Sequence, residues 1–487
     1  MMKLSAGVGR WILLALLGGH LLFRREFAHR NLADIFSLLG RQCPGFLNYA
    51  YITEVLLVLL FPCAAAAAWN RRIKNRELAS SGKALNESLG AGLYLGILFL
   101  LWGLAHAALA FYRGGDMYLI LRQSAMAVYV LVFLYAILLF GDLTGYIRGA
   151  VLFGIVISIA CAVADYLGWL GPNQHFLEST FGQETLPIAI LGLALFVVYW
   201  HDWLWRAMAL IALGFVAWRQ SNRLQSVVPI SLAGALAAYI LLGICLAFRS
   251  QTATLKRGIL CLVLFAGLFI AHRSMRKTSL EDTGEIRAWS PSIYLDLFNV
   301  YERTGPPEDP GNRVFSRRPP FVPVSDPEVY KLNAVYEAAN NVSIRNNMWR
   351  FLVWQRMGGD WWKGGTWCGA DLGKPWFYEA LYHSQFHYGE DREGLDPHNS
   401  HLNLLYRFGL VGFLIYLSIL VSVLYFVWRA LNIRMGHGDA LLEGLALYFF
   451  YTMVFSGFTV SLEGPSYSMP FWFTLGLLYA RARNVEN

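Results

Sequence analysis

The sequence predicts an all-α polytopic membrane protein with about twelve transmembrane helices and one large, mainly helical domain outside the membrane. Of its 487 residues, 56% are hydrophobic and only 15% are charged, which is too apolar for a soluble domain of this size. The apolar residues also fall in blocks, and about 20 such residues cross a hydrocarbon core roughly 30 Å thick. A single long polar stretch, 273–407, interrupts these blocks and forms the domain outside.

The predicted spans form two groups, which divide the chain into spans one to nine (1–272), the loop domain (273–407) and spans ten to twelve (408–487). The 17 tryptophans suit the two membrane interfaces. The apolar segments are 9–23, 48–69, 90–112, 119–140, 149–170, 186–201, 202–218, 227–248, 258–272, 408–428, 441–461 and 469–482.

The basic residues orient the spans. Lys and Arg concentrate in the connections 70–89, 249–257 and 429–440, which twelve spans put on one side together with both termini. The positive-inside rule makes this side the cytoplasm, so the loop domain lies outside. The arginines of 24–41 then fall outside as well. Either the first block is not a simple span, or these arginines meet an anionic ligand.

Charge and cysteine content exclude some classes of function. The net charge of +8 does not indicate a nucleic-acid partner, because the basic residues lie mainly between apolar blocks. The cysteines contain no CxxC pair, and no cofactor is indicated. Cys43 and Cys368 alone fall in predicted external loops, where a disulfide and two free thiols both remain open.

The most informative run extends from Pro397 to Gly412. It places His398 and Asn399 at the outer mouth of a membrane helix. Gly409 and Gly412 follow, and we expect both to allow close approach of a neighbouring helix. A histidine titrates near neutrality, so at such a mouth it suits the role of a general base.

This run resembles the signature of the O-antigen ligase and polymerase superfamily: His398-Asn399, nine residues, then Gly409-x-x-Gly412. Two further resemblances occur in the same order as in the family. Arg223 precedes a membrane helix two helices before the loop, and Arg345-x-x-x-Trp349 opens a loop helix before the Gly-rich turn 364–369. The resemblance covers roughly 200–425.

The resemblance implies a C-type glycosyltransferase-like fold in the bacterial inner membrane, with the active site facing the periplasm. It also implies an inverting, metal-independent glycosyltransferase that moves a glycan from undecaprenyl pyrophosphate to an acceptor hydroxyl. The acceptor is lipid A–core in a ligase, a growing polysaccharide in a polymerase, and protein in an O-oligosaccharyltransferase. One dominant external loop favours the ligase of lipopolysaccharide biosynthesis.

Three residues carry the expected catalysis. His398 is the candidate general base that deprotonates the acceptor. Arg345 and Arg223 are the candidate clamp on the diphosphate, because a guanidinium binds phosphate oxygens bidentately and stays charged. No Asp-x-Asp occurs at a predicted external membrane boundary, so arginines take the place of a metal ion.

Three more residues are expected to bind substrate. Asn399 positions either His398 or the substrate, and Arg122, near the outer end of its span, adds to the anion site. Arg350 competes with Arg345 for the same role. Non-catalytic roles are the alternatives. His398 would then be a capping or solvent-exposed residue at the helix mouth, and the arginines would extend to the membrane interface.

Two other readings remain open. His383, His387, His398 and His401 have spacings that resemble a zinc site, although the acidic run between them is typical of a solvated loop. A transporter of lipid-linked sugars would also have twelve spans, but no internal repeat is evident.

Within the spans, we expect Glu54, His106, Asp165 and Glu443 to bind partners on other helices.

Overall fold

The computed structural model describes residues 2–22, 51–80, 90–139, 202–219, 227–247, 252–276, 342–365, 367–370, 372–373, 399–433, 440–459 and 462–486, with isolated positions between 155 and 199. Within these residues the protein is all-helical and contains no strand. Four described helices are long and apolar enough to cross a membrane, so this part of the chain has the character of a membrane-embedded protein. These helices are Ile52–Asn70, Ala91–Tyr112, Leu119–Leu139 and Ser400–Ile433.

Each predicted span that falls within the described residues coincides with a helix, whereas 149–170 and 186–201 lie outside them apart from isolated positions. The span predicted at 48–69 contains α4 and α5, which join at Leu60, where the backbone stays in the right-handed helical region (φ −76°, ψ −15°). Pro62 fits the first turn of α5 because that turn needs no amide donor. The helices are α1 (Met2–Leu22), α4 (Ile52–Leu59), α5 (Phe61–Ser80), α6 (Ala91–Tyr112), α7 (Met117–Val128), α8 (Val130–Leu139), α11 (Trp203–Arg219), α12 (Val227–Ala247), α13 (Thr252–Arg276), α17 (Val342–Lys363), α19 (Ser400–Ile433), α20 (Ala440–Ser456) and α21 (Pro465–Glu486).

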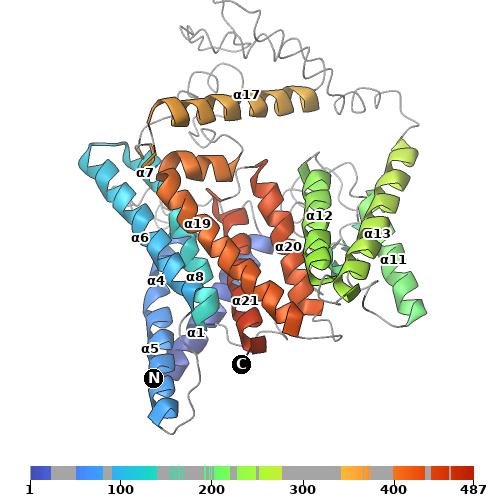
Figure 1. Cartoon of the computed structure of the whole chain (residues 1–487), viewed down its shortest axis with the longest axis horizontal. Helices are drawn as coiled ribbons and strands as arrows, with labels where there is room; N and C mark the ends of the chain where they lie inside the picture. Colours follow the sequence, from blue (N-terminus) through green and yellow to red (C-terminus); the bar gives the residue numbers. More distant parts are fainter. Residues whose placement is uncertain are drawn as a thin grey trace, which may run out of the picture.

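Helix α17, the described helix of the long polar stretch, lies across one end of the bundle (Figure 1). The sequence predicts this helix from the apolar spacing of 344–357, and the structure confirms it. The C-terminal ends of α5, α12 and α19, which lead into the basic connections, lie at the opposite end, as do both chain termini (Figure 1). This arrangement agrees with a loop domain and basic connections on different sides.

The helices pack around two apolar cores. The larger core draws mainly on α1, α4 to α8, α19 and α21, and the smaller on α11, α12, α13 and α20. Helix α8 lies inside the larger core, where Val130–Ile137 is buried throughout. One face of α6 is apolar and exposed at Leu98, Leu101 and Leu104, as lipid contact requires. These cores fix the helices whose ends carry the candidate site.

Candidate functional site

Helix α19 is broken at Gly409, where the backbone takes φ 69° and ψ −175°. Only glycine adopts this conformation without strain. At this break, two backbone hydrogen bonds join α19 to the loop turn at 367–370. Leu410 N–H donates to the carbonyl of Trp367 at 2.8 Å, and Ala370 N–H donates to the carbonyl of Tyr406 at 2.8 Å. The Gly-rich turn of the polar stretch therefore lies directly on the break in α19.

The second glycine of the motif has a different neighbour. A Cβ atom on Gly412 would lie 2.9 Å from the Trp102 ring of α6, and the Trp102 indole donates to the carbonyl of Phe408 at 2.9 Å. The predicted close approach of a helix is thus confirmed for Gly412. For Gly409 the prediction is wrong, because its positive φ ends the helical path and the loop backbone occupies the space.

A buried carboxylate fixes the start of α19. The Ser400 hydroxyl donates to Glu463 and accepts from the Leu462 amide at 3.0 Å. The Asn403 side chain donates to the other oxygen of Glu463 at 3.1 Å. Because Glu463 lies between α20 and α21, it ties the mouth of α19 to both helices.

Asn399 lies at the first turn of α19 and caps it. Its Oδ1 accepts a hydrogen bond from the Leu402 amide at 3.0 Å, which satisfies one of the free donors of the helix start. The expected role of Asn399 in positioning His398 or the substrate stays a prediction.

The far end of the loop turn contacts α7. Gly373 N–H donates to the Gln123 side chain at 2.8 Å, and Asp116 N–H donates to the carbonyl of Gly373 at 2.9 Å. Gln123 directly follows Arg122 in α7. The turn therefore connects the helix that carries Arg122 with the break in α19.

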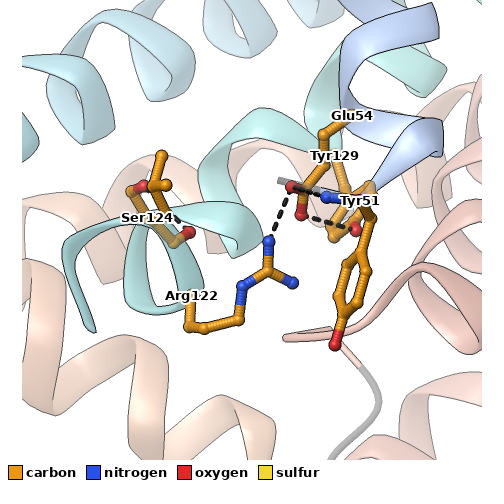
Figure 2. A network of polar contacts seen from close by, with 6 residues as sticks. Tyr51, Glu54, Arg122, Ser124 and Tyr129 are labelled. Atoms are coloured by element: carbon orange, nitrogen blue, oxygen red, sulfur yellow. Dashed lines mark hydrogen bonds and ion pairs between the residues drawn. The ribbon is translucent and has the colours of Figure 1, made fainter. Parts of the chain in front are cut away.

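Arg122 forms an ion pair with Glu54 of α4, with 2.6 Å between Nη2 and Oε2 (Figure 2). The Tyr129 hydroxyl and the Tyr51 amide donate to the same carboxylate at 3.0 and 3.1 Å. The Arg122 guanidinium also lies 3.9 Å from the centre of the Tyr51 ring. The predicted partner for Glu54 is thus confirmed, whereas the binding of an anion by Arg122 stays a prediction.

Glu443 also has the partners that the sequence predicts. Its carboxylate accepts from Arg257 at 2.7 Å and from the Tyr239 hydroxyl. Arg257 additionally donates to the Tyr199 hydroxyl at 3.0 Å. These bonds join α20 to α12 and α13, which gives this cluster a structural role.

Helix α17 is held over the mouth by aromatic contacts. The ring centres of Trp361 and of Trp367 in the turn are 4.6 Å apart. The ring centres of Trp354 and of Phe458, just after α20, are 5.8 Å apart. Arg350 is half-buried in α17, and burial lowers its pKa without removing its charge. Helix α17 also carries the backbone of Arg345.

No protein-family model matches the chain, and neither does any curated protein.

The remaining predicted residues lie only partly within the described residues. His398 and Arg223 lie outside the described residues, as does the side chain of Arg345. Cys368 is exposed and forms no disulfide with a described cysteine, while Cys43 lies outside. Within the described part of the chain, no group of three or more His, Cys, Asp or Glu residues is arranged to hold a metal ion.

The structure also identifies residues that the sequence analysis did not single out. Glu463 binds the mouth and Gln123 binds the turn, and Arg407, two residues before the break, is buried at 3% exposure. An arginine inside the Pro397–Gly412 run was a visible signal for Arg407. No sequence signal pairs Glu463 with Ser400, because they meet only through the packing of α19 against the α20–α21 connection.

Proposed function

We propose that this protein is a metal-independent inverting glycosyltransferase of the O-antigen ligase type. It moves a glycan from undecaprenyl pyrophosphate to a hydroxyl of lipid A–core at the periplasmic face of the inner membrane. One observation carries the proposal: the Gly-rich turn that follows Arg345 is bonded to the helix break that follows His398-Asn399. The turn and the break, which belong to two separate stretches that resemble the superfamily, thus meet at one end of the bundle.

The surrounding contacts support the same location. Helix α17, which contains Arg345 and Arg350, lies across the end of the bundle where α19 begins (Figure 1). The turn is also bonded to Gln123, so it joins the helix of Arg122 to the break in α19. A lipid-linked donor needs its diphosphate at the membrane surface, and this end of the bundle is where those arginine-bearing helices gather.

The chemistry follows from these residue types. The acceptor hydroxyl gives its proton to the His398 imidazole, and its oxygen forms a bond to the anomeric carbon from the face opposite the diphosphate. The bond from that carbon to the diphosphate breaks, and its electron pair leaves with undecaprenyl diphosphate. Arg345 and Arg223 stabilise the negative charge that develops on this leaving group. His398 then releases its proton to solvent.

The test is glycan transfer by the purified full-length protein in liposomes. The reaction contains undecaprenyl-pyrophosphate-linked glycan, lipid A–core and excess chelator, and mass spectrometry identifies the products. We expect glycan-bearing lipid A–core and free undecaprenyl diphosphate. Loss of transfer in chelator that Mg²⁺, Mn²⁺ or Zn²⁺ restores would contradict the metal-independent mechanism. Product on a second lipid-linked glycan or on protein would reassign the acceptor within the superfamily.

A further inference from the structure

The break at Gly409 divides α19 into a short first part that carries the mouth and a longer part that runs through the bundle (Figure 1). A break of this kind leaves the angle between the two parts to other contacts, because the backbone ladder no longer fixes it. Within the described part of α19, a side-chain hydrogen bond crosses the break. It joins His401, before the break, to Tyr416, after it.

The bonding partners determine which ring nitrogen of His401 carries the proton. His401 Nε2 lies 2.9 Å from the carbonyl oxygen of Met453 in α20. A carbonyl oxygen only accepts, so in the neutral ring Nε2 is the donor. Nδ1 is then the acceptor, and it takes the hydrogen bond of the Tyr416 hydroxyl at 3.2 Å. The Met453 sulfur, 3.6 Å from the same hydroxyl, is the weaker acceptor.

Both ring nitrogens of His401 are therefore used by the protein itself. Neither is available to bind a metal ion or to take a proton from a substrate while these bonds persist. Tyr416 is fully buried among Phe99, Phe413 and Trp472, so its hydroxyl is held in place by ring packing. The His401 bond thus starts from a rigid point in the longer part of α19.

We propose that His401 and Tyr416 form a brace across the break in α19 that positions His398 and Asn399 for glycan transfer. The positioning part rests on the proposed function, whereas the brace itself does not. His401 is three residues from His398, and Met453 adds a second point of attachment on α20. His401 acts here as a positioning residue and does not touch the substrate.

Matched substitutions separate the two bonds of His401. Tyr416→Phe removes one hydroxyl and keeps the ring packing. His401→Asn places an amide oxygen near the Nδ1 position and keeps the acceptor for Tyr416. His401→Gln places its amide nitrogen near Nε2 and keeps only the bond to Met453. Ser418→Ala, which removes an exposed hydroxyl bonded to the carbonyl of Leu414, is the control.

The structural readout is hydrogen exchange of the purified full-length protein, followed by mass spectrometry of peptides from 367–373, 399–410 and 412–433. We expect Tyr416→Phe and His401→Gln to speed exchange in the first two peptides by about three- to tenfold, the weight of one hydrogen bond. Peptide 412–433 and Ser418→Ala should stay near wild type, and His401→Asn, which loses only the bond to Met453, should speed exchange less than His401→Gln. The double variant Tyr416→Phe/His401→Gln should match the single variants, because all of them lack the same bond.

The functional readout is kcat and donor affinity in the same proteins. We expect kcat to fall about three- to tenfold in Tyr416→Phe and His401→Gln, with the Kd for the lipid-linked donor unchanged. Unchanged exchange in both variants would overturn the brace. Faster exchange with wild-type kcat would refute its positioning role. If exchange changes as expected but the wild-type protein transfers no glycan, the brace stands and the proposed function fails.

Discussion

Gly369 and Gly409 bring a loop turn and a membrane helix into direct backbone contact: a Cβ atom on Gly409 would lie 2.4 Å from the backbone nitrogen of Gly369. Both glycines have positive φ, 102° and 69°. Neither position can accept a side chain without moving the other segment. The junction between the polar stretch and the bundle therefore depends on these two residues.

Substitution at the junction should be more damaging than substitution at other glycines. Gly409→Ala combines a backbone region that costs about 1–3 kcal/mol with contacts to backbone atoms at 2.4 Å. Gly365→Ala has a positive φ but nothing within 4 Å, and Gly358→Ala has neither problem. Thermal unfolding in detergent should rank their losses in that order, and Gly358→Ala should stabilise by about 0.5–1 kcal/mol. Equal unfolding temperatures for all three would contradict the junction.

The ion pair of Arg122 and Glu54 should be strongly coupled, because the two side chains are only 13% and 12% exposed. Glu54→Gln leaves a buried guanidinium without its carboxylate and should cost about 3 kcal/mol. Glu54→Gln/Arg122→Gln should lose less than the sum of the two single variants. Unfolding of the four proteins in a double-mutant cycle measures this coupling. Additive losses of unfolding free energy would show that the pair is not a stabilising contact. Weaker donor binding by the folded double variant would assign Arg122 to the anion site.

The apolar blocks predict the helices that fall within the described residues, and four of these are long and apolar enough to cross a membrane. Helical spacing likewise predicts α17. The two glycines of the motif, however, have different roles: Gly409 breaks α19 beside the loop backbone, and Gly412 lets α6 approach. Only the backbone conformation distinguishes them. Glu463 contacts Ser400, 63 residues away in the sequence, and His401 contacts Met453, 52 residues away. Such contacts arise from tertiary packing, for which the sequence has no periodic signal.

The two ends of the bundle should face different sides of the membrane. Phe351 of α17 and Ile73 of α5 are both exposed, at 53% and 41%. Their helices lie toward opposite ends of the molecule (Figure 1). Each is replaced by cysteine in a background whose native cysteines are changed to serine. In sealed cells, an impermeant thiol reagent should label position 351 and leave position 73 unlabelled until the membrane is permeabilised. Labelling of both positions in sealed cells would refute the topology.

The two arginines of α17 should differ in their effect on catalysis. Arg345→Ala should lower turnover about 10²-fold or more, the usual effect of removing a donor that stabilises developing charge. Arg345→Lys should restore only part of the activity, because a point charge does not reproduce a bidentate fork. Arg350→Ala, at a half-buried position, should have the smaller effect. Transfer assays on folded variants decide between them, and a larger loss for Arg350→Ala would exchange their roles.

The most direct measurement compares donor binding and transfer by His398→Ala with those of wild type. If His398 is the general base, the variant should bind the lipid-linked donor normally and lose turnover by about 10²–10⁴-fold. His401→Ala should lose less, because His401 positions the mouth and takes no proton. His437→Ala, in the basic connection predicted to lie on the cytoplasmic side, is the matched control and should transfer normally. Near-normal turnover by His398→Ala, with transfer abolished in His401→Ala, would contradict the assignment of the base and the account built on it.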